Sequence, residues 1–361
     1  MVLVQPPPCR IRKIAVAAVC LAGICWVVQP DLHAAPPSPD AAKEHFEKGI
    51  TLFREGDPDG SIQALKRAIE LNPRLTEAHH VLGLVYFKGK RDAPHAVESL
   101  NEAHKLNPRS PRILNDLADV YIAQGKSQEA EEVLRKAIDV SPAGKEAYLD
   151  LARLYEGRQD RIAASRVYQT LLRMHPDQTD ALYNLANLYD SQGDSRSARE
   201  QLTRLTKVNP KHADAWYLLG RLAERSNNLT EAARAYGEAI RARPELVDAH
   251  YNLAFVHRSQ GSLVDAEKEF LEVLRYRPDY AEAHMNLGMV YTSLNRLDEA
   301  ERSYGQAVAL KPDSLEAHYN IGVFYELHRK DMIKALVHYR RYRDLGGRDD
   351  RVERIIGRSA Q

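Results

Sequence analysis

The residues best suited to chemistry in this sequence are histidines that recur in equivalent segments. Four of them share one position within the surrounding pattern: His79, His250, His284 and His318. A column of imidazole rings could bind metal ions, because histidine is a common zinc ligand. However, consecutive members are at least 34 residues apart, and no carboxylate recurs one helical turn away as in the zinc motif H-E-x-x-H. We therefore interpret these histidines as packing residues and predict no metal site.

Motifs for nucleotide binding and nucleophilic catalysis are also missing from the sequence. It contains no phosphate loop of the form G-x-x-x-x-G-K-[ST], no G-x-G-x-x-G after a strand and no G-x-S-x-G elbow. Cys9, Cys20 and Cys25 are the only cysteines, which excludes disulfides and thiolate metal sites from the rest of the chain. We expect no catalytic residues and no cofactor, so the protein is predicted not to be an enzyme.

Asparagines at a second recurring position point instead to the binding of a polypeptide. Four of them occupy equivalent places: Asn184, Asn252, Asn286 and Asn320. An amide both donates and accepts hydrogen bonds, so a row of amides could pair with an extended peptide backbone whatever its sequence. Large apolar residues accompany them: Tyr251, Tyr319, Phe255, Met285 and Met289. With acidic residues nearby, this pattern predicts a groove for a partner segment with hydrophobic and some basic side chains. The alternatives are that the asparagines face water and that the aromatic residues are buried.

Regularly spaced prolines indicate the structural elements that must position these residues. They are Pro73, Pro108, Pro142, Pro176, Pro210, Pro244, Pro278 and Pro312, with a first step of 35 residues and six further steps of 34. A fixed period of this length indicates a repeat architecture. We count nine repeats, the last of which has Gly346-Gly347 in place of the proline.

Each repeat has the pattern of two short helices. Apolar residues recur at helical spacing, as in Leu287, Val290 and Tyr291. Residues that tolerate a left-handed backbone follow the first helix: Gly56, Gly125, Gly193, Asn227, Gly261 and Asn295. Asp279-x-x-Glu282 and Asp313-x-x-Glu316 resemble capping boxes at helix starts. Glycine or alanine recurs at one position of the first helix, as at Gly288, and alanine at one of the second, so the two helices are expected to approach closely.

These features resemble the tetratricopeptide repeat family, with its 34-residue period, paired small residues and terminal proline. The resemblance implies an all-α, right-handed solenoid of about nine helix-turn-helix units over residues 42–347, whose first helices line a groove. A short capping helix is expected within residues 348–361, from Val352, Ile355 and Ile356. The asparagines resemble the ladder of the superhelical repeats of O-linked N-acetylglucosamine transferase, which grips a peptide backbone. Leu218 interrupts that ladder here, and the transferase's catalytic domain is absent.

The start of the chain is predicted to be a targeting segment. Basic residues precede an apolar run over 14–28, which is long for a signal peptide core and short of the roughly 20 residues that span a bilayer. We expect residues 1–35 to be a signal peptide or N-terminal anchor and residues 36–41 a Pro-rich linker. The protein is then exported to the periplasm or cell surface, or held at the inner membrane by residues 14–28.

Charge and pattern together favour a scaffold for protein partners. The chain has 51 basic and 50 acidic residues, so no overall field attracts nucleic acid, and the groove positions are acidic or apolar. We expect a protein or peptide partner, no nucleic acid, and membrane contact only through an uncleaved N-terminal segment. The predicted role is assembly of an envelope or surface complex. The alternative is a regulatory or substrate-recruiting subunit of an enzyme, such as a glycosyltransferase or a polysaccharide export system.

The repeat alignment makes one prediction about stability. Ala232 falls at the small position of a second helix, so Ala232→Leu should overpack its repeat and lower the free energy of unfolding by roughly 1–3 kcal/mol. A thermal melt measures this effect. An unchanged melting temperature would contradict the alignment.

Overall fold

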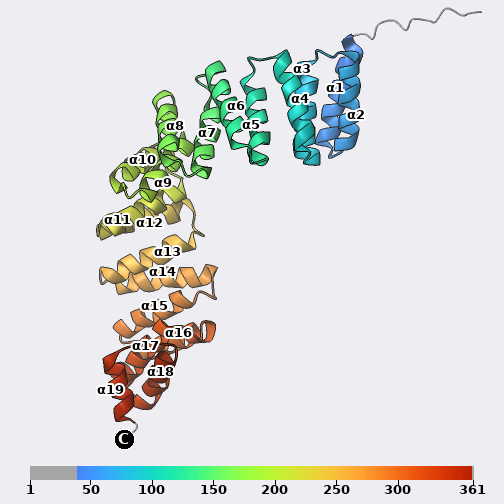
Figure 1. Ribbon diagram of the computed structural model, residues 1–361. Coiled ribbons are helices and arrows are strands. Elements are labelled where there is room, and N and C mark those ends of the chain that lie inside the picture. The colour runs from blue at the N-terminus through green and yellow to red at the C-terminus, as the bar shows by residue number, and fades with distance from the viewer. Residues whose placement is uncertain (1–38, 360–361) are drawn as a thin grey trace, which may run out of the picture.

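A computed structural model of the chain describes residues 39–359, which form nine pairs of helices and one additional helix (Figure 1). The first helices of the pairs are α1 (Pro39–Arg54), α3 (Thr76–Leu84), α5 (Pro111–Ala123), α7 (Lys145–Gly157), α9 (Thr179–Ser191), α11 (Ala213–Arg225), α13 (Val247–Ser259), α15 (Ala281–Ser293) and α17 (Leu315–Phe324). The second helices are α2 (Pro58–Leu71), α4 (Ala93–Leu106), α6 (Ser127–Val140), α8 (Arg161–Met174), α10 (Ser195–Val208), α12 (Leu229–Ala242), α14 (Leu263–Tyr276), α16 (Leu297–Leu310) and α18 (Met332–Asp344). The part of the chain that the structure describes contains no strand.

Each helix packs against the helices before and after it in sequence, which gives a right-handed solenoid. Figure 1 shows the stack bending near α7 and α8, with the two ends of the described chain at opposite ends of the array. The last helix, α19 (Asp350–Arg358), buries Val352 and Ile356 against Tyr339 and Tyr342 of α18. The predicted all-α solenoid of nine units with a capping helix is therefore confirmed.

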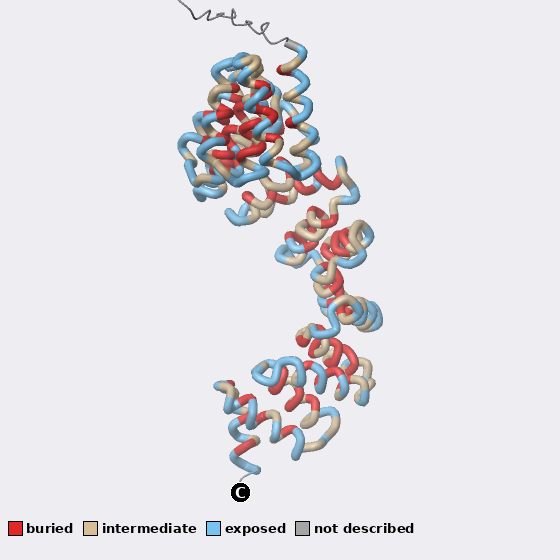
Figure 2. The backbone as a smooth tube through the Cα atoms, turned by 90° about the vertical axis from the view of Figure 1, so that its right-hand side faces the viewer, coloured by how far each residue is buried: buried red, intermediate tan, exposed pale blue. Residues whose placement is uncertain are grey.

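The two helices of each pair meet through a small residue on one and a large residue on the other. A Cβ atom added to Gly322 would lie 2.5 Å from the ring of Tyr339, and Gly288 faces Tyr304 in the same way at 2.7 Å. The predicted alanine position of the second helix, which includes Ala232, is fully buried in every repeat where it occurs. Figure 2 shows buried residues on the facing sides of the helix pairs along the whole array. The core is therefore a continuous series of local contacts.

The turn between the two helices has a left-handed backbone in all nine repeats. The predicted glycines and asparagines adopt it, with φ values from 56° at Asn227 to 84° at Gly56. The other three repeats place Arg91, Gln159 and Lys330 there, with φ of 53°, 62° and 54°. Such side chains crowd the left-handed conformation. The geometry of the helix pair, and not the residue type, thus determines this turn.

The second and ninth repeats each have one additional residue at the end of the first helix. In the second repeat, α3 continues as a π-helical turn, η1 (Val85–Gly89), and in the ninth repeat α17 continues as η2 (Tyr325–Arg329). The amide of Asp92 donates to the carbonyl of Tyr86, and that of Asp331 to Tyr325. A π turn holds the additional residue inside the helix, so the packing of the next helix is unchanged.

Two expectations about helix starts are wrong. Asp279 and Asp313 do not cap helices, because α15 begins after Tyr280 without a side-chain cap, and Ser314 caps α17 by accepting from the amide of Ala317. Residues 39–41, expected within the linker 36–41, belong to α1, since a proline at a helix start loses no intrahelical hydrogen bond. The predicted signal peptide or anchor, residues 1–35, lies outside the described residues. No helix in the described range is long and apolar enough to span a membrane.

The left-handed turns predict that Gln159→Gly will stabilise the protein. Glycine avoids a steric cost of about 1–2 kcal/mol at this φ but gains freedom in the unfolded chain, so we expect a net gain of about 0.5–1 kcal/mol. Gln63→Gly, in the interior of α2, is the matched control and should cost about 1 kcal/mol. Urea unfolding measures both changes. A loss of stability from both substitutions would contradict the turn argument.

Candidate peptide-binding face

The recurring histidines of the first helices are structural hydrogen-bond donors. The Nε2 atoms of His79, His250, His284 and His318 lie 2.9–3.0 Å from the carbonyl oxygens of the prolines six residues earlier. Trp216 makes the same contact through its indole nitrogen, 2.9 Å from the carbonyl of Pro210. These rings therefore tie each first helix to the loop that precedes it. Within residues 39–359, no group of three or more potential ligands is arranged to hold a metal ion.

The predicted asparagine ladder lies on the surface made by the first helices, which we call the first-helix face. Its amides contact the preceding repeat. The Nδ2 atom of Asn252 donates to the hydroxyl of Tyr217 at 3.3 Å, and that of Asn286 to the hydroxyl of Tyr251 at 3.0 Å. Asn320 reaches the sulfur of Met285 at 3.6 Å. The ladder thus joins neighbouring repeats to one another.

The nine predicted groove residues differ in how accessible they are. Phe255 is exposed, with the guanidinium of Arg258 4.7 Å from its ring centroid. Six others are partly exposed: Asn184, Tyr251, Asn252, Met289, Tyr319 and Asn320. Met285 and Asn286 are buried, each with 6% of its surface exposed. These two residues therefore offer little surface to a ligand, because Asn286 bonds to Tyr251 of the preceding repeat and Met285 lies in a buried hydrophobic cluster.

The amide of Asn286 has almost no hydrogen-bonding capacity left for a ligand in this arrangement. Its Nδ2 atom donates to Tyr251 and, at 2.8 Å, to the carbonyl of Glu282, while its Oδ1 atom accepts from Arg258 at 2.8 Å. Both amide hydrogens and one oxygen lone pair are used within the protein. Of the residues around it, Phe255 and Met289 reach the surface, whereas Asn286 is buried.

The first-helix face also contains a hollow that sequence reasoning did not identify as a site. It has a volume of about 450 Å³ and lies between α5 and α7. Four carboxylates line it, Asp116, Asp119, Glu146 and Asp150, with Arg112 as the single basic residue in its lining. Asp116 and Asp150 occupy, in the third and fourth repeats, the position that holds asparagine in later repeats. Asp119 and Glu146 could be assigned to this site only from the structure, since their side chains come together only when the helices stack.

The electrostatics of this acidic hollow favour a positively charged ligand. The residue Asp119 is exposed to solvent on one side and packs between the repeats on the other. This partial burial, together with the nearby carboxylates Asp150 and Asp116, raises the pKa of Asp119 to about 6. Burial also raises the pKa of Asp150, against the opposing effect of Arg153. Asp116 is hydrogen-bonded to the Nε2 atom of His80 at 2.6 Å, in a further contact between repeats. A basic side chain in the hollow would relieve the repulsion among these carboxylates.

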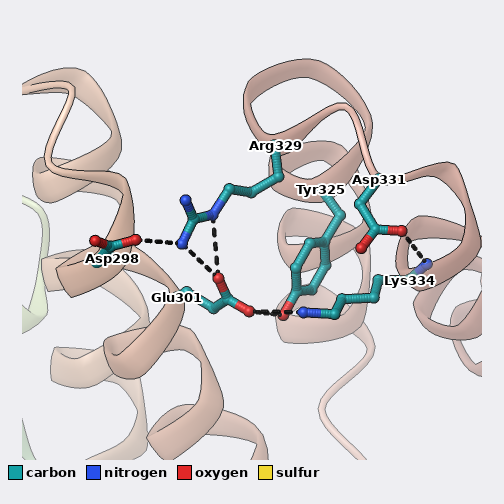
Figure 3. Close-up of polar contacts among 6 residues, drawn as sticks. All are labelled: Asp298, Glu301, Tyr325, Arg329, Asp331 and Lys334. Atoms are coloured by element: carbon teal, nitrogen blue, oxygen red, sulfur yellow. Dashed lines mark hydrogen bonds and ion pairs between the residues drawn. The ribbon is translucent and has the colours of Figure 1, made fainter.

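Another group of charged residues on the array is structural. Figure 3 shows Glu301 of α16 accepting from the hydroxyl of Tyr325 at 2.8 Å, from Lys334 at 3.0 Å and from Arg329 at 2.7 Å. Burial alone would raise the pKa of Glu301, but these hydrogen bonds lower it to about 2. Glu131 makes equivalent contacts with a tyrosine and an arginine of the next repeat. These networks join neighbouring repeats.

The raised pKa of Asp119 predicts how stability depends on pH. Its folded pKa of about 6 exceeds the ordinary value of 3.8, so its contribution to stability is fully present below about pH 4 and is lost as pH rises through 6. Asp119→Asn should therefore raise the melting temperature at pH 7.5 and not at pH 4. Solvent screening limits the gain to less than about 1 kcal/mol.

The control for this measurement is Asp139→Asn, which removes an exposed carboxylate of α6. It should change the melting temperature little and without a dependence on pH. Equal effects of Asp119→Asn at pH 7.5 and pH 4 would contradict the proposed repulsion in the hollow.

Similar folds occur among solved structures. A crystal structure described as the MamA protein is 23% identical, covers 48% of this chain and 94% of its own, and has a TM-score of 0.44. YrrB, described as a TPR protein with an unusual peptide-binding site, is 20% identical over 52% of this chain and 96% of its own, with a TM-score of 0.48. The C-terminal part of a TPR repeat-containing protein from Cytophaga hutchinsonii is 15% identical, covers 67% and 98%, and has a TM-score of 0.56. No curated protein matches the chain.

Family models match most of the repeat array. Models described as tetratricopeptide repeats match residues 115–177, 149–195, 183–245, 220–274 and 257–304, and another matches 89–139. A model described as TPR repeat matches residues 49–89 and 288–328. These matches agree with the helix pairs, the small-to-large contacts and the period. The chain belongs to the tetratricopeptide repeat family.

Proposed function

We propose that this protein is a non-catalytic scaffold that binds an extended segment of a partner protein along its first-helix face. Tetratricopeptide repeat proteins bind peptide or protein partners. The observation that carries the proposal is the acidic hollow between α5 and α7, whose lining contains four carboxylates and one arginine. We infer that a lysine or arginine of the partner segment occupies this hollow.

The size and charge of the hollow suit such a side chain. A volume of about 450 Å³ accommodates a lysine or arginine side chain and part of the adjoining backbone. A guanidinium or ammonium group between Asp119 and Asp150 would make charge-assisted hydrogen bonds, which are among the stronger contacts available to a peptide. Because a cation stabilises the ionised carboxylates, binding should release protons near pH 6 and be weaker at pH 5.

The apolar part of the partner segment would bind further along the same face. Phe255 is exposed, and Met289 and Tyr319 are partly exposed, so they offer apolar surface in the last three repeats. A segment that reaches from the hollow to these residues would be extended across several repeats. We also propose that the partner belongs to an envelope or surface assembly, which is supported only by the apolar run over 14–28 and the basic residues before it.

A selection of displayed peptides tests this function. Peptides from a random library are selected on the full chain and should be enriched in lysine and arginine. The double substitution Asp119→Asn and Asp150→Asn should weaken the selected peptides by about tenfold or more, because it removes two charge-assisted contacts. Fluorescence anisotropy measures the affinities.

The matched control removes two carboxylates from second helices, Asp139→Asn and Asp265→Asn, with the same change in net charge. It should leave the affinities within about twofold of the unmodified protein. Selected peptides without basic residues, or peptides that bind both variants equally, would contradict the proposal.

A further inference from the structure

The second helices of the fourth and fifth repeats, α8 and α10, concentrate positive charge. α8 contains three arginines and no acidic residue, and α10 contains three arginines, one lysine and one glutamate. We define the basic face by six side chains of these two helices that are exposed or partly exposed: Arg166, Arg173, Arg196, Arg199, Arg204 and Lys207. The nearly neutral charge of the whole chain conceals this local excess.

The basic face is not neutralised by the protein. None of its six side chains forms an ion pair within residues 39–359, and their hydrogen bonds go to uncharged acceptors. Arg173 donates to the hydroxyl of Thr170 at 2.9 Å, and Arg204 to the side chain of Gln201 at 2.9 Å and the carbonyl of Pro176 at 3.1 Å.

Other second helices behave differently. Arg135 of α6 pairs with Glu131, and Arg234 of α12 pairs with Glu231 at 2.7 Å. Arg199 lies near enough to Glu231 to help lower the pKa of that carboxyl, but Glu231 is already paired with Arg234. The repeats on either side of the basic face therefore match arginine with carboxylate, while α8 and α10 leave their guanidinium groups available. This contrast indicates a surface kept for an external anion.

Two adjoining hollows give the basic face a shape that can hold a ligand. One, of about 470 Å³, is lined by Arg166, Arg173 and Arg204 together with hydroxyl and amide groups. The other, of about 650 Å³, is lined by Arg196, Arg199, Arg204 and Lys207, with Glu200 as its one carboxylate. Because Arg204 lines both, the two hollows form one surface across α8 and α10.

The residue types on this surface select the class of ligand. Five of the six basic groups are arginines, whose planar guanidinium groups bind carboxylates through two parallel hydrogen bonds. Single-stranded nucleic acid is usually bound through aromatic rings on which bases stack. α10 has no aromatic residue, and Tyr168 of α8 is fully buried. The one ring in the linings of the two hollows is Tyr189 of α9, whose hydroxyl accepts a hydrogen bond from Gln169 at 2.7 Å. A single ring cannot stack successive bases. Met174 and Val208, exposed at the ends of the two helices, offer apolar contacts that a polypeptide can use and a uronic acid polymer cannot.

We propose that the basic face binds an acidic polypeptide segment of a partner protein, through carboxylate pairs with the arginines of α8 and α10. This binding site is separate from the first-helix face and does not depend on the function proposed for that face. The protein would then hold two oppositely charged segments at once.

The test measures binding of the full chain to a random copolymer of glutamate and tyrosine. The variant carries Arg166→Gln, Arg173→Gln, Arg196→Gln and Lys207→Gln, since glutamine keeps the helix propensity of these positions. Circular dichroism establishes that the variant is folded. We expect its affinity for the copolymer to fall by about tenfold or more.

The control variant removes the same net charge from exposed second-helix residues that already have acidic partners: Arg67→Gln, Lys105→Gln, Arg275→Gln and Arg343→Gln. It should bind the copolymer within about twofold of the unmodified protein. Equal losses in both variants would overturn the proposal, because they would reflect net charge alone.

Three further probes identify other occupants of the same face. They are polygalacturonate, a single-stranded thymidine oligonucleotide, and vesicles of phosphatidylglycerol and phosphatidylcholine. Tighter binding of any of these than of the copolymer, lost in the basic-face variant, would replace the acidic polypeptide with that ligand. Sedimentation velocity adds the last outcome: self-association abolished in the basic-face variant would make the occupant a second copy of this chain. Weaker binding of all three and a monomeric protein would support the proposal.

Discussion

The close approach of the two helices within each repeat is the constraint on which the structure depends. It requires a glycine or alanine on the first helix and a large ring or leucine on the second. Where that small residue is Gly220, Gly288 or Gly322, the ring opposite leaves no room even for a methyl group. This contact sets the angle of each pair, and the angle sets which side chains the next repeat can reach. A solenoid built this way propagates local geometry along its length, because each repeat contacts only its neighbours.

Most polar residues at recurring positions stabilise these contacts within and between neighbouring repeats. The histidines bind the carbonyl of the preceding proline, the asparagines bind the repeat before them, and Glu301 binds the repeat after it. Each group is partly buried, where an unpaired polar atom would cost free energy, so its partner must be present in every copy. Recurrence therefore indicates a structural role at least as often as a binding role. In this chain the residues that differ between repeats, such as Asp119 and Arg204, are better candidates for binding.

The fold could be predicted from the sequence because its determinants are local and repeated. Small residues and helical periodicity agree in nine repeats and the terminal proline in eight, so an error in interpreting one repeat is corrected by the others. The exceptions have physical reasons. Gln159 adopts the left-handed turn because its neighbours impose it, and the additional residue of the second repeat enters a π turn that no residue type signals. The binding surfaces were predicted less well. The burial of Asn286 depends on Tyr251, which lies 35 residues earlier in the sequence. The acidic hollow depends on the stacking of α5 on α7.

The separation of charge across the array explains why composition alone is a poor guide to its partners. Acidic residues meet on the first-helix face at α5 and α7, and unpaired arginines gather on the second helices α8 and α10, so the sum is close to zero. A helix with its side chains is about 10 Å thick, and the screening length at physiological ionic strength is about 8 Å. Two faces separated by a pair of helices therefore do not cancel each other's fields. A nearly neutral chain can present one surface that attracts cations and another that attracts anions, which is what a scaffold needs in order to hold two unlike partners without confusing them.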